Sequence, residues 1–185
     1  MIKKKNIFII IGSAGNHSAN EQLVEHFTKL TAGFFNVTIY KDLKKLPHFD
    51  PELSTDNPPP EIAAFRDNIK DTDGIIICTP EYIFSIPSGL KNILEWCVAT
   101  TVFSDKPTGL ITASAHGQKG HEELQLIMKT LSAKFTNETS LLIQGIKGKI
   151  NVQGQITHEK TASDFADFIQ AFKALINLQP TIIQE

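Results

Sequence analysis

The stretch IFIIIGSAGNHSAN, residues 7–20, joins a continuous apolar run to a loop of small polar residues and then to the start of a helix. An unbroken β-branched run of this kind predicts a strand that is covered on both faces, as in the middle of a parallel sheet. Ser18 and Glu21 have the spacing of a helix capping box, and apolar residues recur at helical spacing from there to Leu30. A polar loop therefore leads directly from a buried strand into a helix.

The same order occurs twice more along the chain. A run at 74–78 predicts a second buried strand, with a loop before a helix from Pro87 to about residue 99. Residues 108–113 predict a third, followed by a glycine-rich loop at 116–120 and a helix over 122–131. A polar loop thus follows each of three predicted buried strands.

Other segments complete the pattern. The prolines at positions 47, 51 and 58–60 predict irregular structure until a helix begins near residue 61. Gly145, Gly148 and Gly154 predict a loop or small hairpin between the last strand and the last helix. The remaining predicted elements are strands at 36–40 and 140–143 and helices at 61–69 and 161–178. Alternating strands and helices predict a parallel sheet with helices on both faces.

Size and composition favour one globular domain over residues 1–185. Apolar residues make up 41% of the chain and charged residues 21%. A formal net charge of −2 provides no field that would hold a nucleic acid. The apolar run after Lys3–Lys5 is too short for a signal peptide, so we expect a cytoplasmic protein without a membrane anchor.

The cysteines and histidines do not predict a metal site. Cys78 and Cys97 lie on a predicted buried strand and a predicted helix, and we expect both to be reduced thiols in the core. No two histidines have metal-ligand spacing. We expect His17, His48, His121 and His158 to be exposed.

The first polar loop has two interpretations. Hydroxyls, amides and free N–H groups at the start of a helix suit an anion such as a terminal phosphate, with Ser13, Ser18 and Asn20 as its ligands. An ordinary strand-to-helix turn capped by Ser18 would have the same composition. The loop lacks both the GxGxxG pattern of dinucleotide folds and the GKS or GKT of a P-loop.

Two motifs together resemble the NADPH-dependent FMN reductase family. GSAGNHSAN at 12–20 is similar to its GSxRxxSxN pattern, and TPEYIFSIPSGLKNILEW at 79–96 is similar to TPEYNxSxPGxLKNAxDW. The second motif matches at Thr79, Pro80, Glu81, Tyr82, Ser85, Pro87, Leu90, Lys91, Asn92 and Trp96. The resemblance implies a flavodoxin-like three-layer α/β sandwich with a five-stranded parallel sheet of order 2-1-3-4-5. It also implies bound FMN and a homodimer or homotetramer.

The family's cofactor contacts can be carried over by position. The resemblance places the FMN phosphate on the first loop and the isoalloxazine ring between the loops after the second and third buried strands. The implied contacts are Ser13, Ser18, Ala19, Asn20, Pro80, Glu81, Tyr82, Ile83, Phe84, Ser85, Ser114, His116 and Gly117. Placement of a hydride donor on the flavin is sufficient for the reaction, so no catalytic side chain is assigned.

The chain departs from the family pattern at two positions. Gly15 stands where the family has a phosphate-binding Arg, and Ile83 stands where it has Asn. Losing the Arg removes a bidentate charged donor. We therefore expect FMN to be held loosely unless His17, a neighbouring lysine or helix-end amides compensate.

Several side chains keep more than one interpretation. Tyr82 can contact the flavin or pack within its loop, and Phe84 can meet the flavin edge, a second subunit or the core. Lys91, Asn92 and Trp96 favour helix packing or a subunit interface over ligand contact. His116 can meet the flavin edge or the substrate.

The resemblance implies an oxidoreductase that passes electrons from NADPH or NADH through FMN to a small acceptor. A quinone, an azo compound, free flavin and chromate all remain open as the acceptor. One alternative is a flavodoxin-like electron carrier, although the chain lacks a TxTGxT phosphate loop and strong acidity. The other is a binding module that has lost FMN.

Overall fold

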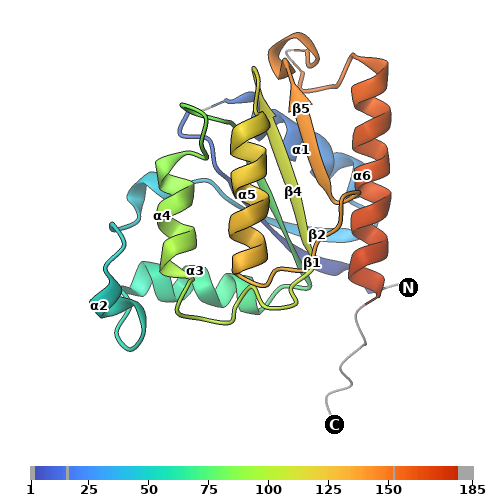
Figure 1. Ribbon diagram of the computed structural model, residues 1–185. Helices are drawn as coiled ribbons and strands as arrows, with labels where there is room; N and C mark the ends of the chain where they lie inside the picture. Colours follow the sequence, from blue (N-terminus) through green and yellow to red (C-terminus); the bar gives the residue numbers. More distant parts are fainter. Residues whose placement is uncertain (1–2, 16, 152, 179–185) are drawn as a thin grey trace.

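A five-stranded parallel sheet forms the centre of the computed structural model, which describes residues 3–15, 17–151 and 153–178 (Figure 1). Its strands are β1 (Lys5–Ile11), β2 (Phe35–Tyr40), β3 (Gly74–Thr79), β4 (Thr108–Ser114) and β5 (Ser140–Gln144). They lie in the order β2-β1-β3-β4-β5, and every neighbouring pair is parallel. The predicted strand order is confirmed.

Helices cover both faces of this sheet and produce the predicted three layers (Figure 1). One face carries α1 (Ala19–Thr31) and α6 (Glu159–Asn177), and the other carries α3 (Pro60–Lys70), α4 (Ser88–Trp96) and α5 (Gln118–Thr130). Side chains of β1 alternate between the two cores, since Phe8 packs with the α3 face and Ile9 with the α1 face. Burial on both sides explains the unbroken apolar run.

The proline-rich segment after β2 is more regular than the sequence predicts. A 3-10 turn, η1 (Leu43–Lys45), and a short helix, α2 (Pro51–Ser54), lie within it. Pro51 and Pro60 each occupy the first position of a helix. A proline is tolerated there because the first N–H of a helix has no partner within the helix. The prediction of irregular structure was therefore wrong for parts of this segment.

Helix α5 begins at Gln118, four residues earlier than the sequence predicts. Gly117 precedes it in a left-handed conformation (φ 87°), which glycine adopts without strain. Gly120 therefore lies inside the helix rather than in a glycine-rich loop. The start of the helix is determined by a contact from another loop, described below.

The segment between β5 and α6 folds back over α1. It contains a 3-10 turn, η2 (Ile146–Gly148), and an antiparallel bridge between Ile150 and Ile156, consistent with the predicted small hairpin. A Cβ added at Gly154 would lie 3.4 Å from the Cβ of Gln22 in α1. This β5–α6 excursion, defined here by its described residues 145–151 and 153–156, thus reaches the first turns of α1.

Both cysteines are buried free thiols, as predicted. Burial raises the pKa of Cys78 and raises that of Cys97 to about 12. In the part of the chain that the structure describes, no helix has the length and apolar character needed to cross a bilayer.

Candidate functional site

Three loops meet at the carboxyl ends of β1, β3 and β4, where ligands bind in open α/β sheets. Two hollows lie there, one on each side of a wall that contains Ser13, Gly15 and Tyr82. The β5-side hollow, of about 870 Å³, extends to the β5–α6 excursion. The β2-side hollow, of about 360 Å³, extends to the segment after β2 and the start of α4.

The β5-side hollow gathers predicted cofactor contacts from all three loops. Those that line it are Ser13, Ser18, Ala19, Asn20, Pro80, Tyr82 and Ser114. Its volume lies within the roughly 300–1,000 Å³ typical of small-molecule and cofactor sites. The other predicted contacts, Glu81, Ile83, Phe84, Ser85, His116 and Gly117, lie outside its lining.

The first loop forms most of its hydrogen bonds with the helix that it leads into. Ser18 caps α1, its Oγ accepting the N–H of Glu21 at 3.2 Å. The Glu21 carboxylate accepts the N–H of His17 at 2.8 Å, so the predicted capping box closes one residue early. Lys41 donates to Glu21 and, as the main cause, lowers the pKa of that carboxyl. Asn16 of this loop lies outside the described residues.

Asn20 ties the first loop to the sheet. It is 3% exposed, and its Nδ2 donates to the carbonyl of Ala113 in β4 at 3.1 Å. The Sγ of Cys78 approaches its Oδ1 at 3.4 Å. The side-chain amide therefore already has partners within the protein, on the floor of the β5-side hollow.

Two carboxylates join the loop after β3 to helix α5, and we call these contacts the loop clamp. The Glu81 carboxylate accepts the N–H groups of Gly117 and Gly120 at 3.1 and 2.8 Å. The Glu123 carboxylate accepts the Ser85 hydroxyl at 2.6 Å and the Ile86 N–H at 3.0 Å. Each element thus supplies one carboxylate to the other.

Sequence reasoning did not identify the loop clamp. It included Glu81 among the implied cofactor contacts and gave Glu123 no role. The sequence prediction began this helix at residue 122, so no signal marked Gly117 as the residue before it, whose lack of a side chain leaves the first N–H groups without a local cap. A helix without a local cap requires an acceptor from elsewhere, and Glu81 is that acceptor.

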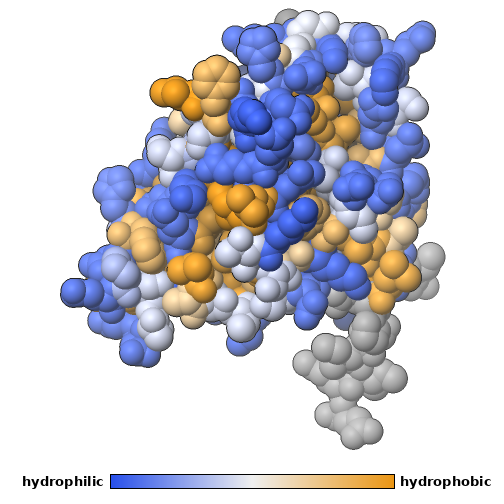
Figure 2. Space-filling model, in the orientation of Figure 1, coloured by the Kyte–Doolittle hydropathy of each residue, from blue (hydrophilic) through white to orange (hydrophobic). Residues whose placement is uncertain are grey.

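The apolar tip, Ile83 and Phe84, closes a two-residue hairpin turn. Tyr82 and Ser85 exchange backbone hydrogen bonds of 2.9 and 3.1 Å across it. Both tip residues have positive φ, 50° and 60°, a conformation that suits Asn and is strained for a β-branched residue. Their exposed fractions are 94% and 74%, and Figure 2 shows this apolar tip at the edge of the molecule.

Helix α4 holds the outer wall of the β2-side hollow. Asn92 accepts the N–H of Phe49 at 2.7 Å and donates to the carbonyl of Pro47 at 2.9 Å. Trp96 is buried and donates to the same carbonyl. The packing interpretation of Asn92 and Trp96 is confirmed, while Lys91 forms an ion pair with Glu95 along the helix.

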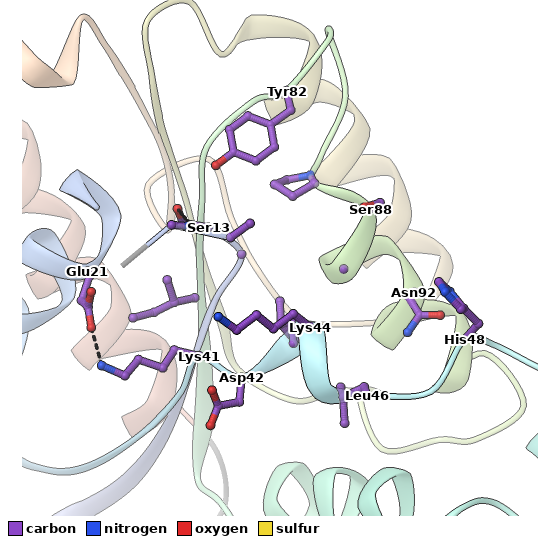
Figure 3. A pocket seen from close by; sticks show the side chains of 17 residues that line it. Ser13, Glu21, Lys41, Asp42, Lys44, Leu46, His48, Tyr82, Ser88 and Asn92 are labelled. Atoms are coloured by element: carbon purple, nitrogen blue, oxygen red, sulfur yellow. Dashed lines mark hydrogen bonds and ion pairs between the residues drawn. The ribbon is translucent and has the colours of Figure 1, made fainter. Parts of the chain in front are cut away.

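Charged side chains surround the β2-side hollow (Figure 3). Lys41 is paired with Glu21, and Asp42 is paired with Lys45. Figure 3 shows the Lys44 side chain extending into the space between the first loop and α4. The hollow therefore contains both signs of charge.

His121 corrects a prediction, since it is buried rather than exposed. The early start of α5 directs this residue toward the sheet, where its Nδ1 lies 2.8 Å from Thr112 Oγ1 and its Nε2 lies 3.1 Å from Ser140 Oγ. Burial lowers the pKa of His121. His17, His48 and His158 are exposed as predicted, and His116 is exposed on the turn before α5.

A model of the NADPH-dependent FMN reductase family matches residues 5–147. The chain belongs to this family. A (hydroxy)cinnamate reductase subunit, CrdA, of Vibrio ruber is 27% identical over 97% of the chain and 91% of its own length. A quinone reductase of Escherichia coli K12 is 25% identical over 95% of the chain and 97% of its own length. The protein is therefore an oxidoreductase.

Solved structures share the fold. FerB, a flavoenzyme NAD(P)H:acceptor oxidoreductase from Paracoccus denitrificans, superposes with a TM-score of 0.82 over 94% of this chain and 97% of its own, at 24% identity. A flavodoxin WrbA-like protein from Agrobacterium tumefaciens gives a TM-score of 0.60 over 95% of this chain and 100% of its own, at 14% identity. Family membership and fold both confirm the resemblance read from the two motifs.

The donor set of the β5-side hollow fits FMN. The start of α1 offers N–H groups and the Ser13 and Ser18 hydroxyls for a phosphate. Tyr82, 44% exposed, offers an aromatic face, and Pro80 offers an apolar wall, for a flat ring system. Among the described residues, no group of three His, Cys, Asp or Glu side chains is arranged to hold a metal ion.

Proposed function

We propose that the protein holds FMN in the β5-side hollow and transfers electrons from NADPH or NADH to a small acceptor. The observation that carries the proposal is the convergence of the family's motif positions from three loops on one hollow. The phosphate would lie on the first loop, at Ser13 and the Ser18–Asn20 segment. The ring would lie between the 80–85 loop and the segment 114–117.

When bound, FMN supplies the chemistry, accepting a hydride at its ring and passing on two electrons. The chain's own residues bind and orient. The N–H groups of α1 and the Ser18 hydroxyl would hold the phosphate, and the loop clamp would fix the walls on either side of the ring. Tyr82 lies in the wall shared by the two hollows, where its aromatic side chain would orient the ring. Placing the hydride donor against the flavin accounts for the rate of transfer, so the reaction needs no acid or base side chain.

We propose a quinone as the acceptor class. Relatives named quinone reductase and 2-hydroxy-1,4-benzoquinone reductase support this choice. Azo compounds, free flavin and chromate are the other acceptors consistent with an open site. Family membership disfavours both the electron carrier and a binding module without FMN.

The family resemblance further supports a homodimer or homotetramer in the cytoplasm, with residues 1–185 acting as one unit. The exposed apolar tip offers two adjacent apolar side chains that a second subunit could cover. Size-exclusion chromatography with light scattering measures the assembly directly.

The visible spectrum tests the function. Purified protein is incubated with FMN, desalted, treated anaerobically with NADPH or NADH, and then given 1,4-benzoquinone. We expect retained flavin absorbance that bleaches with the nucleotide and returns with the quinone. Flavin that is retained but stays oxidised would support the carrier alternative, and protein that retains no flavin would contradict the proposed site.

A further inference from the structure

The first loop lacks a cation for the FMN phosphate, which carries close to two negative charges at neutral pH. A Cβ added at Gly15, where the family pattern has Arg, would meet no atom within 4 Å, so the position is open space. Glu21, in the first turn of α1, adds a negative charge that its ion pair with Lys41 offsets. The first turn therefore contributes helix-end amides and hydroxyls but no net positive charge.

The β5-side hollow has a cation on its opposite wall. Among its described lining residues there is no aspartate or glutamate, and Lys147 is the residue that carries a full positive charge at neutral pH. Lys147 forms no ion pair within 4.0 Å with any described carboxylate. Its charge is thus available to a ligand in the hollow.

Contacts on both sides fix the segment that carries Lys147. Gly145 donates its N–H to the carbonyl of Ala115 at 3.1 Å, which joins the excursion to the loop after β4. Ile146 is 4% exposed and packs in the core beneath α1 and α6. Further along, Gly154 packs against Gln22 at the start of α1. The β5–α6 excursion therefore forms a defined wall that faces the first loop.

We propose that Lys147 supplies the positive charge that binds the FMN phosphate, in the role that the family pattern gives to the residue at position 15. This inference rests on the proposed function, because it assigns the phosphate to the β5-side hollow. The family pattern has an arginine in the first loop, whereas this lysine lies on the opposite wall. It would act as a point charge on a flexible side chain. Lys44 is the competing cation, but its hollow also contains Asp42 and Glu21.

The test compares FMN with riboflavin, which has the same ring and no phosphate. Dissociation constants are measured from quenching of flavin fluorescence for the wild type and for K147Q, K149Q and K44Q. Losing a charged hydrogen-bond partner predicts about 10- to 100-fold weaker FMN binding by K147Q, with riboflavin binding unchanged. Lys149 is the matched control, since it lies two residues away and does not line the hollow.

A second variant keeps the test interpretable if K147Q perturbs the fold. G15R restores the family residue in open space, so we expect it to tighten FMN binding and to abolish most of the effect of K147Q in the double variant. If K147Q binds FMN with wild-type affinity, or if only K44Q loses FMN affinity, the assignment of Lys147 is wrong and the proposed function stands. A wild-type protein that binds neither flavin would overturn the proposed function as well.

Discussion

The two ends of the candidate site are built differently. At the proposed ring end, the loop after β3 and the start of α5 are joined by the loop clamp, whose four hydrogen bonds connect residues far apart in sequence. At the proposed phosphate end, the described residues 13–15, 17 and 18 hydrogen-bond only within the first loop and the first turn of α1, while Asn20 bonds to Ala113 of the sheet. The proposed ring end is held by long-range contacts before a ligand arrives, whereas the first loop, apart from Asn20, retains donors for a ligand.

This difference matches the two parts of the ligand. A flat ring gains affinity and a defined orientation from walls that do not move, because less ordering accompanies binding. A phosphate is bound by donors and charge, which remain effective in a loop that still adjusts. This comparison implies that changes at the ring end affect mainly the stability of the protein, whereas changes at the phosphate end also affect FMN binding. The variants below test this difference.

The largest expected effect is that of Glu81→Ala, which removes the acceptor for two N–H groups at the start of α5. We expect a loss of about 3 kcal/mol in the free energy of unfolding, because hydrogen bonds to charged groups each contribute about 1.5–3 kcal/mol. Urea unfolding measures it. Glu122→Ala is the matched control on an exposed face of α5, and a similar loss in both variants would contradict the loop clamp.

The buried His121, in the helix that the loop clamp holds, predicts a pH dependence of the stability. Its pKa is lowered in the fold, so below about pH 6.5 the unfolded chain takes up a proton that the folded protein does not. Stability therefore falls as the pH drops below that value, by at most about 1.4 kcal/mol per pH unit for one proton. We expect His121→Gln to reduce the slope of the stability curve measured by urea unfolding from about pH 8 down to about pH 5.5, with part of the slope kept by His26, whose pKa burial also lowers. His48→Gln, on an exposed residue, should retain the wild-type slope.

At the phosphate end, Ser18→Ala tests the cap of α1. Removing an N-cap hydroxyl costs about 1 kcal/mol of stability, and the same change removes a predicted phosphate ligand. We expect the loss in thermal or urea stability to be larger with saturating FMN than without it. Thr28→Ala, near the far end of α1, should leave FMN binding unchanged. Equal losses with and without FMN would indicate that Ser18 is only a cap.

The smallest effect concerns the apolar tip, which lies outside both hollows. Asn tolerates the positive φ of residue 83 better than Ile does, so Ile83→Asn should stabilise the protein by about 0.5–1 kcal/mol. Ile83→Val keeps the β-branch and should bring no gain. A loss of stability in the Asn variant, appearing only at protein concentrations where an oligomer forms, would instead indicate that the tip is covered by another subunit.

Local patterns were sufficient to predict the sheet. The apolar run at 7–11 predicts a buried parallel strand, and Ser18 marks the start of α1 within one residue. The start of α5 was wrong because its cap comes from Glu81, 36 residues away from Gly117 in sequence. The same long-range contact moved His121 from a predicted exposed position into the core.

The candidate site could be predicted only as far as its motifs extend. Motif positions located the first loop and the 80–85 loop, because both signals are contiguous in sequence. Lys147 lies after β5, and its place on the wall facing the first loop depends on how the excursion returns to α1. Motif matching gave no reason to connect that lysine with Gly15.

The burial of both thiols affects how the protein withstands its proposed substrates. Quinones add to thiolates, and the thiolate rather than the thiol is the reactive form of cysteine. Cys78 and Cys97 are buried, and their raised pKa values keep them protonated at neutral pH. An enzyme of this composition can turn over an electrophile repeatedly without being alkylated at its own cysteines.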